Sequence, residues 1–411
     1  MNPLKQKAKR PDEIFMDWKT IYPDPYDKNE VDPYTRLRII LMNGAEYEAT
    51  WFSHQFHRHC GNNDLRRELA VLRRAEQQQQ KRISCLKPID ETVLETTIGY
   101  EQLAVDLTAI LAQREPDRYV ADVMDFALLE DFDHLYRYAD LLELERGIHA
   151  ERLVGSYTEI MPGRPTIAEH RHPHDSVRTA CNFAKAAPIT KLNTAIITAA
   201  EQQTMNYYMN IAGFYDSDMG RRLYQEIGMI EEQHVTQYGA LLDTSCTWLE
   251  NLLLHEYTEC YLYYSCFEDE TDPHIKKLWE QHFEQEVSHL HTAARLLEQY
   301  EGKEAAQLIP EGEFPALLKF SPQKDYVRKV LGGTVCHTAD KEKIVPLESL
   351  NADADFYKYQ KMTTPDATRV PSHQVIKEEI GTRGKDYRFE EKEHPVEALR
   401  ERTRDNITLA R

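Results

Sequence analysis

The chain lacks the residue patterns that several common kinds of functional site require. Its seven cysteines form no C-x-x-C pair, which argues against a zinc ribbon, a rubredoxin-type iron centre and a dithiol redox motif. It has no Gly-rich phosphate loop and no nucleophile elbow, so nucleotide binding and acyl transfer have no support. The formal net charge is −19 and no long basic stretch interrupts it, so nucleic acid is not an expected partner.

Long apolar runs are also missing. None approaches the roughly 20 residues that cross a bilayer, and residues 1–5 lack the apolar stretch of a signal peptide. We therefore expect a cytoplasmic protein with no membrane partner. With 411 residues, of which 41% are hydrophobic, the chain can bury a substantial core.

The acidic residues follow a spacing that repeats along the chain. A glutamate is followed thirty residues later by an acidic residue, which has a histidine three positions beyond it. Three sets share this pattern: Glu101, Asp131 and His134; Glu201, Glu231 and His234; and Glu256, Glu286 and His289. A turn-forming cluster lies halfway through each set, so each set predicts a helical hairpin. At 1.5 Å rise per residue, both acids then lie roughly 22 Å from the hairpin tip, at one level on two antiparallel helices.

The apolar spacing of the predicted helices indicates which way these acids point. In each second helix the acid and the histidine occupy consecutive positions of the apolar seam, as in Ile227, Glu231, His234 and Tyr238. Ionised carboxylates in such a seam are unfavourable unless they are paired or bind a metal ion. The alternative to metal binding is that histidine and tyrosine hydrogen bonds satisfy the buried acids.

This ligand pattern resembles a known superfamily. A glutamate from one helix of each hairpin and a Glu-x-x-His from the other form the ligand set of ferritin-like di-iron and di-manganese carboxylate proteins. The resemblance covers residues 90–300 and implies an all-α fold, a ferritin-like four-helix bundle that is enlarged here by a third hairpin. The long connection between the first two hairpins is similar to the crossover of such bundles.

The pattern divides the chain into three parts. Residues 1–89 are expected to form an N-terminal arm and helices, with a helix favoured over a hairpin about Asn43-Gly44. Residues 301–411 are expected to form an extended C-terminal tail, with a short helix from Pro395 to about Arg404. The bundle between them consists of three hairpins, at residues 90–145, 190–245 and 247–300, and of a crossover at residues 146–189 between the first two hairpins.

The resemblance implies that hairpins one and two hold a pair of iron ions, with manganese or one ion of each as alternatives. The implied ligands are Glu101, Asp131, His134, Glu201, Glu231 and His234. Asp131 is one methylene shorter than the usual bridging glutamate, and the neighbouring Glu130 is the alternative bridging acid.

The third hairpin offers a second metal site, with Glu256, Glu286, His289 and, one turn earlier, His282. Four arrangements stay open for it. It pairs with the same hairpin of a second subunit in a homodimer, pairs with hairpin two, holds a single ion, or binds no metal.

The resemblance also implies a reaction class. Two neighbouring iron ions can reduce dioxygen or peroxide by two electrons, so we expect a di-iron oxidoreductase, such as an oxidase or oxygenase of a small organic substrate with an external electron donor. Thr204 and Tyr208 are candidate catalytic residues that steer protons or electrons, and core packing is the alternative role for both. Two other functions stay open: a peroxide-scavenging or metal-handling ferritin-like protein, and a non-catalytic helical structural protein.

Overall fold

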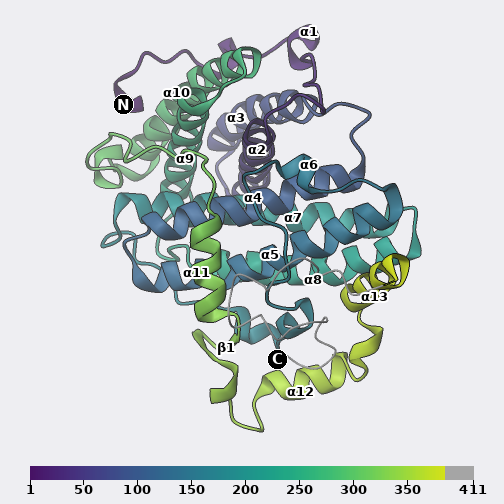
Figure 1. Cartoon of the computed structure of the whole chain (residues 1–411). Helices are drawn as coiled ribbons and strands as arrows, with labels where there is room; N and C mark the ends of the chain where they lie inside the picture. The colour runs from purple at the N-terminus through teal and green to yellow at the C-terminus, as the bar shows by residue number, and fades with distance from the viewer. Residues whose placement is uncertain (385–411) are drawn as a thin grey trace. The chain divides into compact units, whose positions relative to one another are not determined.

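The computed structural model of the chain describes residues 1–384, which are predominantly helical (Figure 1). This confirms the expected all-α class. The chain forms two compact units. Unit 1 consists of Met1–Glu91, Cys181–Ala200 and Asp243–Phe320, and unit 2 consists of Thr92–Ala180, Glu201–Leu242 and the described residues from Ser321 to Gly384. The helix expected from Pro395 to about Arg404 lies outside the described residues.

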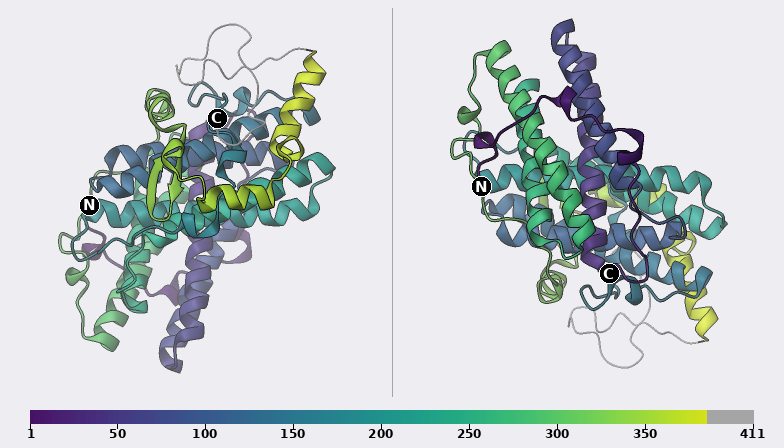
Figure 2. Two further views of the ribbon diagram at one scale, coloured as in Figure 1. Left: turned by 90° about the horizontal axis from the view of Figure 1, so that it is seen from below. Right: turned by 90° about the horizontal axis from the view of Figure 1, so that it is seen from above.

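Unit 1 is built from two long helical hairpins, which Figure 2 shows as a purple-to-blue pair and a green pair. They consist of α2 (Pro33–His59) with α3 (Asn63–Ser84), and α9 (Trp248–Asp269) with α10 (Pro273–Glu301). The two helices of each hairpin pack along each other, and α2 also contacts α9 while α3 contacts α10. Helix α2 continues through Asn43-Gly44, which confirms the helix expected there.

Short segments complete unit 1. The first residues form two 3-10 turns, η1 (Pro3–Lys5) and η2 (Pro11–Glu13), which pack against α10, and one short helix, α1 (Trp18–Ile21). The hydroxyl of Ser288 on α10 donates to the Lys9 carbonyl at 2.6 Å, which fixes this arm to the helix. A further 3-10 turn, η5 (Ala305–Gln307), follows α10.

Unit 2 contains a second pair of hairpins: α4 (Val93–Arg114) with α5 (Arg118–Arg146), and the part of α7 (Pro188–Phe214) from Glu201 onward with α8 (Asp218–Ala240). Side chains define where these helices begin. Thr92 and Glu95 form a capping box at the start of α4, and Asp117 and Ser217 cap α5 and α8. Gly147 ends α5 in the left-handed conformation, with φ of 64°.

The C-terminal segment belongs to unit 1 up to Phe320, and its described residues from Ser321 to Gly384 are folded onto unit 2, in place of the extended tail expected from its prolines. Its elements are α11 (Lys324–Thr334), the antiparallel strands β1 (His337–Asp340) and β2 (Lys343–Pro346), η6 (Leu347–Ser349), α12 (Asp355–Thr363), η7 (Ala367–Arg369) and α13 (Pro371–Arg383). Helix α11 packs on α5, and α13 packs on α5 and α8. The segment is ordered because its spaced apolar residues, among them Val327, Leu331 and Val375, join the hydrophobic core of unit 2.

The crossover between α5 and α7 contains α6 (Glu151–Val154), η3 (Thr166–Glu169) and η4 (Pro173–Ser176). Buried Asp133 on α5 fixes it in place. The Asp133 carboxylate accepts hydrogen bonds from the Thr166 backbone N–H at 2.9 Å and the Thr166 hydroxyl at 2.7 Å, and it pairs with Arg137 at 2.9 Å. Two residues of the crossover, Glu169 and Arg171, are thereby buried in unit 2.

The grouping of the helices differs from the single enlarged bundle expected over 90–300. The third hairpin, α9 and α10, belongs with α2 and α3 in unit 1 and not with the other two hairpins. The reason lies in the N-terminal helices, which carry buried seams of their own. The seam residues are Met42, Glu46, Ala49 and Ser53 on α2, and Leu72, Glu76, Gln79 and Ile83 on α3.

No helix within residues 1–384 is long and apolar enough to cross a membrane. The cytoplasmic location stays a prediction.

Replacing Asp133 with alanine should destabilise the protein by about 3–5 kcal/mol, because Arg137, which is 1% exposed, would lose its buried counter-charge. Urea unfolding of the metal-free protein measures this loss. Asp216→Ala is the matched control, since its carboxylate pairs with Arg146 at the surface, and it should change stability by less than about 1 kcal/mol. Equal losses in both variants would contradict the role of Asp133.

Candidate metal centres

The six residues predicted as the main metal site come together in unit 2. All six are at most 1% exposed, and we call them the unit 2 cluster: Glu101, Asp131, His134, Glu201, Glu231 and His234. Two overlapping groups of four have ligand atoms that all lie within 4.8 Å of one another. One group contains Glu101 and His134 and the other contains Glu201 and His234, and Asp131 and Glu231 belong to both.

The two histidines present the same ring nitrogen to the carboxylates. His134 Nδ1 lies 2.9 Å from Glu231 Oε1. His234 Nδ1 lies 3.1 Å from Asp131 Oδ1 and 3.3 Å from Glu231 Oε2. Each Nδ1 is therefore directed at the shared acids.

Two further carboxylates lie behind the imidazole rings. Glu130 Oε2 is 2.7 Å from His234 Nε2, and Glu169 Oε2 is 3.6 Å from His134 Nε2. A carboxylate on the remote ring nitrogen fixes the tautomer and the orientation of a metal-binding histidine. Glu130, the alternative bridging acid, is thus placed beside His234 and belongs to neither group of four.

Glu130 is held by buried arginines. Arg171 Nη1 lies 2.7 Å from Glu130 Oε1 and Arg164 Nη1 lies 3.5 Å from it. Both guanidinium groups also lie over the Phe126 ring, at 4.4 Å for Arg164 and 4.9 Å for Arg171. Although burial opposes ionisation, the charge of Arg171 and the contact with His234 hold the pKa of Glu130 well below its usual range.

The four acids of the unit 2 cluster have no such partner, since no Lys or Arg of residues 1–384 forms an ion pair with Glu101, Asp131, Glu201 or Glu231. Neither oxygen of Asp131 or Glu201 accepts a hydrogen bond. Two divalent cations would neutralise the four carboxylates, and carboxylate and imidazole donors suit iron and manganese. The donor set therefore fits a pair of such ions.

Protons must carry this charge when no cation is bound. Burial raises the pKa values of Glu101, Glu201 and Asp131, so these groups tend to hold their protons. The exception is Glu231. Burial opposes its ionisation, but the charge of His234 and the hydrogen bond from His134 lower its pKa to about 2.

The two candidate catalytic residues lie on α7 beside the cluster. The Tyr208 hydroxyl donates a 2.5 Å hydrogen bond to Glu101 Oε1, and its ring lies 5.3 Å from that of Tyr138. Tyr208 thus positions a carboxylate of the cluster. Thr204 is buried three residues after Glu201, and the catalytic role of both residues stays a prediction.

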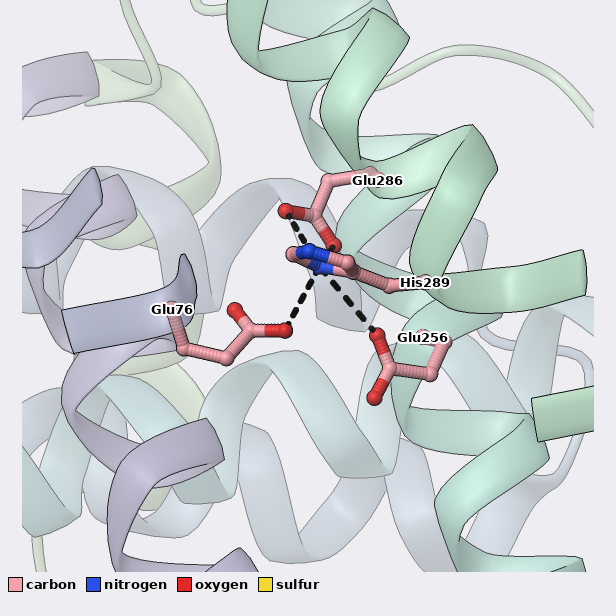
Figure 3. Close-up of side chains that lie close together, drawn as sticks. All are labelled: Glu76, Glu256, Glu286 and His289. Atoms are coloured by element: carbon pink, nitrogen blue, oxygen red, sulfur yellow. Dashed lines mark hydrogen bonds and ion pairs between the residues drawn. The ribbon is translucent and has the colours of Figure 1, made fainter. Parts of the chain in front are cut away.

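A second cluster lies in unit 1, where the third hairpin meets α2 and α3. Figure 3 shows Glu76, Glu256 and Glu286 arranged around the His289 ring. His289 Nδ1 lies 2.7 Å from Glu76 Oε1, 3.3 Å from Glu286 Oε1 and 3.9 Å from Glu256 Oε2. A second group shares Glu76 and adds two more carboxylates, and we call all six residues the unit 1 cluster: Glu46, Glu76, Glu256, Glu259, Glu286 and His289.

Three of the four residues predicted for the second site are therefore brought together, and His282 is not. His282 Nδ1 lies 3.1 Å from the Tyr263 hydroxyl and Nε2 lies 3.5 Å from Arg82. Tyr263 in turn donates to Glu46, so His282 acts behind the cluster. The hairpin partner is α2 with α3 of the same chain, an arrangement that was not among those left open, and no second subunit is required to complete the cluster.

The sequence analysis missed Glu46, Glu76 and Glu259, although two of them follow the thirty-residue spacing. Glu46 and Glu76 are thirty residues apart, and Gln79 stands where the other sets have histidine. Gln79 Nε2 donates to Glu286 Oε1 at 2.6 Å, so it faces the cluster as a histidine would. A search for spaced acids on an apolar seam, without the histidine requirement, could have found this fourth hairpin.

Comparison of the chain with protein-family models, with curated proteins and with solved structures gave no match. The ferritin-like resemblance therefore stays a prediction from the sequence.

Replacing Glu130 with glutamine should lower the affinity of unit 2 for metal about 10- to 100-fold, because His234 loses the carboxylate that orients it. Competition with a fluorescent chelator measures the affinity. Glu232→Gln, an exposed position on α8, is the control and should match the wild type. Unchanged affinity in a folded Glu130→Gln protein would rule out this orienting role.

Metal should stabilise the protein more at pH 8 than at pH 5.5. Burial and the neighbouring Glu130 raise the pKa of Glu169 to about 8, and burial raises those of Glu101 and Glu201. The unfolded chain releases these protons above about pH 4.3, so the folded metal-free protein binds more protons and loses stability as pH rises.

Bound cations would replace the protons of the ligands Glu101 and Glu201, so the gap in melting temperature between loaded and metal-free protein should widen with pH. Thermal unfolding of both forms at the two pH values measures it. A gap that stays constant or narrows would show that the acids do not retain protons in the metal-free protein.

Proposed function

We propose that the unit 2 cluster binds two iron ions, or manganese in place of one or both, and that the protein is an oxidoreductase acting with dioxygen or peroxide. The observation that carries the proposal is the overlap of two four-residue groups at Asp131 and Glu231. Shared carboxylates keep two cations close enough to act on one small molecule.

Each ion would have the same kinds of ligand. Glu101 and His134 would hold one, Glu201 and His234 the other, and Asp131 and Glu231 would serve both. A bound pair of this kind supplies two-electron reduction of dioxygen or peroxide. An oxidase or oxygenase of a small organic molecule would also need an external electron donor.

The chain's own residues would keep the site dry and oriented. The ligands are at most 1% exposed, and Tyr138, Tyr208 and Tyr238 are fully buried. The pKa of Tyr208 is raised, first by burial and then by the charge of Glu101, so its hydroxyl keeps its proton and donates to that carboxylate. Glu130 holds the remote nitrogen of the His234 imidazole at 2.7 Å, and Glu169 lies 3.6 Å from the remote nitrogen of His134.

The proposal predicts that protein loaded anaerobically with Fe²⁺ consumes dioxygen or hydrogen peroxide faster than free Fe²⁺. Glu231→Gln removes one shared carboxylate and should lower the rate at least about 100-fold, because both ions lose a ligand. Oxygen-electrode and peroxide assays measure the rate, with Glu232→Gln as the control that retains it.

The same assays separate the candidate functions. Sustained peroxide consumption without an organic substrate would favour the peroxide-scavenging alternative. If the fully loaded protein consumes dioxygen or peroxide no faster than free Fe²⁺, the result would favour the metal-handling alternative. If unit 2 takes up no metal, the proposal is overturned and the non-catalytic structural role is the remaining alternative.

A further inference from the structure

The unit 1 cluster is as buried as the unit 2 cluster but carries more negative charge. Its six residues are at most 2% exposed, and five of them are glutamates, against four acids in unit 2. Within residues 1–384 no Lys or Arg forms an ion pair with any of the five, and His289 is the basic group at their centre. One imidazole cannot balance five carboxylates.

Glu259 is the carboxylate of the unit 1 cluster that has no hydrogen-bond donor. Its side chain is 1% exposed, and neither of its carboxylate oxygens accepts a hydrogen bond. His255 Nε2 is 3.6 Å away, beyond hydrogen-bonding distance. An oxygen of Glu259 nevertheless lies within 4.8 Å of oxygens of Glu46 and Glu76. Three buried carboxylates converge on this point, where His289 contacts Glu76 and Tyr263 donates to Glu46 but no donor reaches Glu259.

The two clusters occupy equivalent positions in a repeat. Glu46 and Glu101 are 55 residues apart, as are Glu201 and Glu256 and the two tyrosines Tyr208 and Tyr263. In each cluster a tyrosine seven residues after a glutamate donates to the glutamate of the facing hairpin: Tyr208 to Glu101, and Tyr263 to Glu46. The metal-binding framework of unit 2 is therefore reproduced in unit 1, independently of the charge argument.

The candidate metal ligands of the two clusters differ at two positions that matter for the choice of metal. Gln79 stands where unit 2 has His134, and Glu259 stands where unit 2 has Thr204, both at the offset of 55 residues. An imidazole is lost and a carboxylate is gained. Oxygen-only donor sets suit hard cations such as Mg²⁺, Ca²⁺ and Mn²⁺, whereas imidazole favours iron and zinc.

We infer that the unit 1 cluster is a second metal centre, inequivalent to the first, with an all-carboxylate position at Glu46, Glu76 and Glu259 that takes a hard divalent cation. A second position, at Glu76, Glu256, Glu286 and His289, shares Glu76 with it. This inference concerns metal binding alone and does not require the redox function proposed for unit 2.

The experiment measures bound manganese per chain by elemental analysis, after loading the metal-free full-length protein with Mn²⁺ and removing excess ion. The wild type should retain four ions. Glu76→Gln, which removes the shared ligand, should retain two, and Glu259→Gln should retain three. Glu231→Gln should lose ions from unit 2 and keep those of unit 1, which separates this inference from the proposed function.

Glu284→Gln, an exposed neighbour of Glu286 on α10, is the matched control and should retain the wild-type content. Gln79→His supplies a test that does not depend on removing an acid. It restores the imidazole found in unit 2 and should raise the preference of unit 1 for Zn²⁺ over Mn²⁺ at least about tenfold, because imidazole favours zinc.

Equal manganese content in the wild type, Glu76→Gln and Glu259→Gln would overturn the inference, and so would a metal preference unmoved by Gln79→His. If Glu76→Gln fails to fold, Glu259→Gln and Gln79→His carry the test.

Discussion

The constraint on which the structure depends is the burial of carboxylates that no Lys or Arg of residues 1–384 neutralises. Four acids in unit 2 and five in unit 1 lie inside helical seams, and the buried arginines Arg164 and Arg171 pair with Glu130, which lies outside the unit 2 cluster. A single buried acid can be neutralised by a proton, but groups of four and five repel one another at close range. The fold gathers them at one level of each unit, and bound cations are the simplest charge to offset them.

The helical framework could be predicted from sequence because the seams have a regular period. The spacing of Glu101, Asp131 and His134, and its two repeats, predicted which helices pair into hairpins and which acids face inward. Position along a helix fixes the direction of a side chain. The sequence could not show which hairpins pack together, because that depends on contacts between segments far apart in the chain. The pairing of the third hairpin, α9 and α10, with α2 and α3 was therefore not predicted.

The rest of the site was beyond prediction for a related reason. Glu169 and Arg171 belong to an irregular Pro-rich crossover, where no period indicates burial, and hydrogen bonds to Asp133 place them there. Glu259 lies on a helix, but no spacing rule set it apart from other acids. Gln79 was missed for a different reason. Its position follows the repeated spacing, but the pattern required a histidine there.

The order of the hairpins along the chain has a topological consequence. The hairpin α2–α3 comes first along the chain and packs with the last one, α9–α10, whereas the two hairpins between them, α4–α5 and α7–α8, pack with each other. The half of the chain that holds the first two hairpins repeats in the other half at an offset of 155 residues, from Glu46 to Glu201 and from Glu101 to Glu256. Each cluster consequently draws its residues from both halves of the polypeptide. A chain cut in the crossover would yield two fragments, neither of which contains a whole cluster, and only their reassociation could rebuild both. A shorter progenitor with this topology would have had to exchange hairpins between two identical copies.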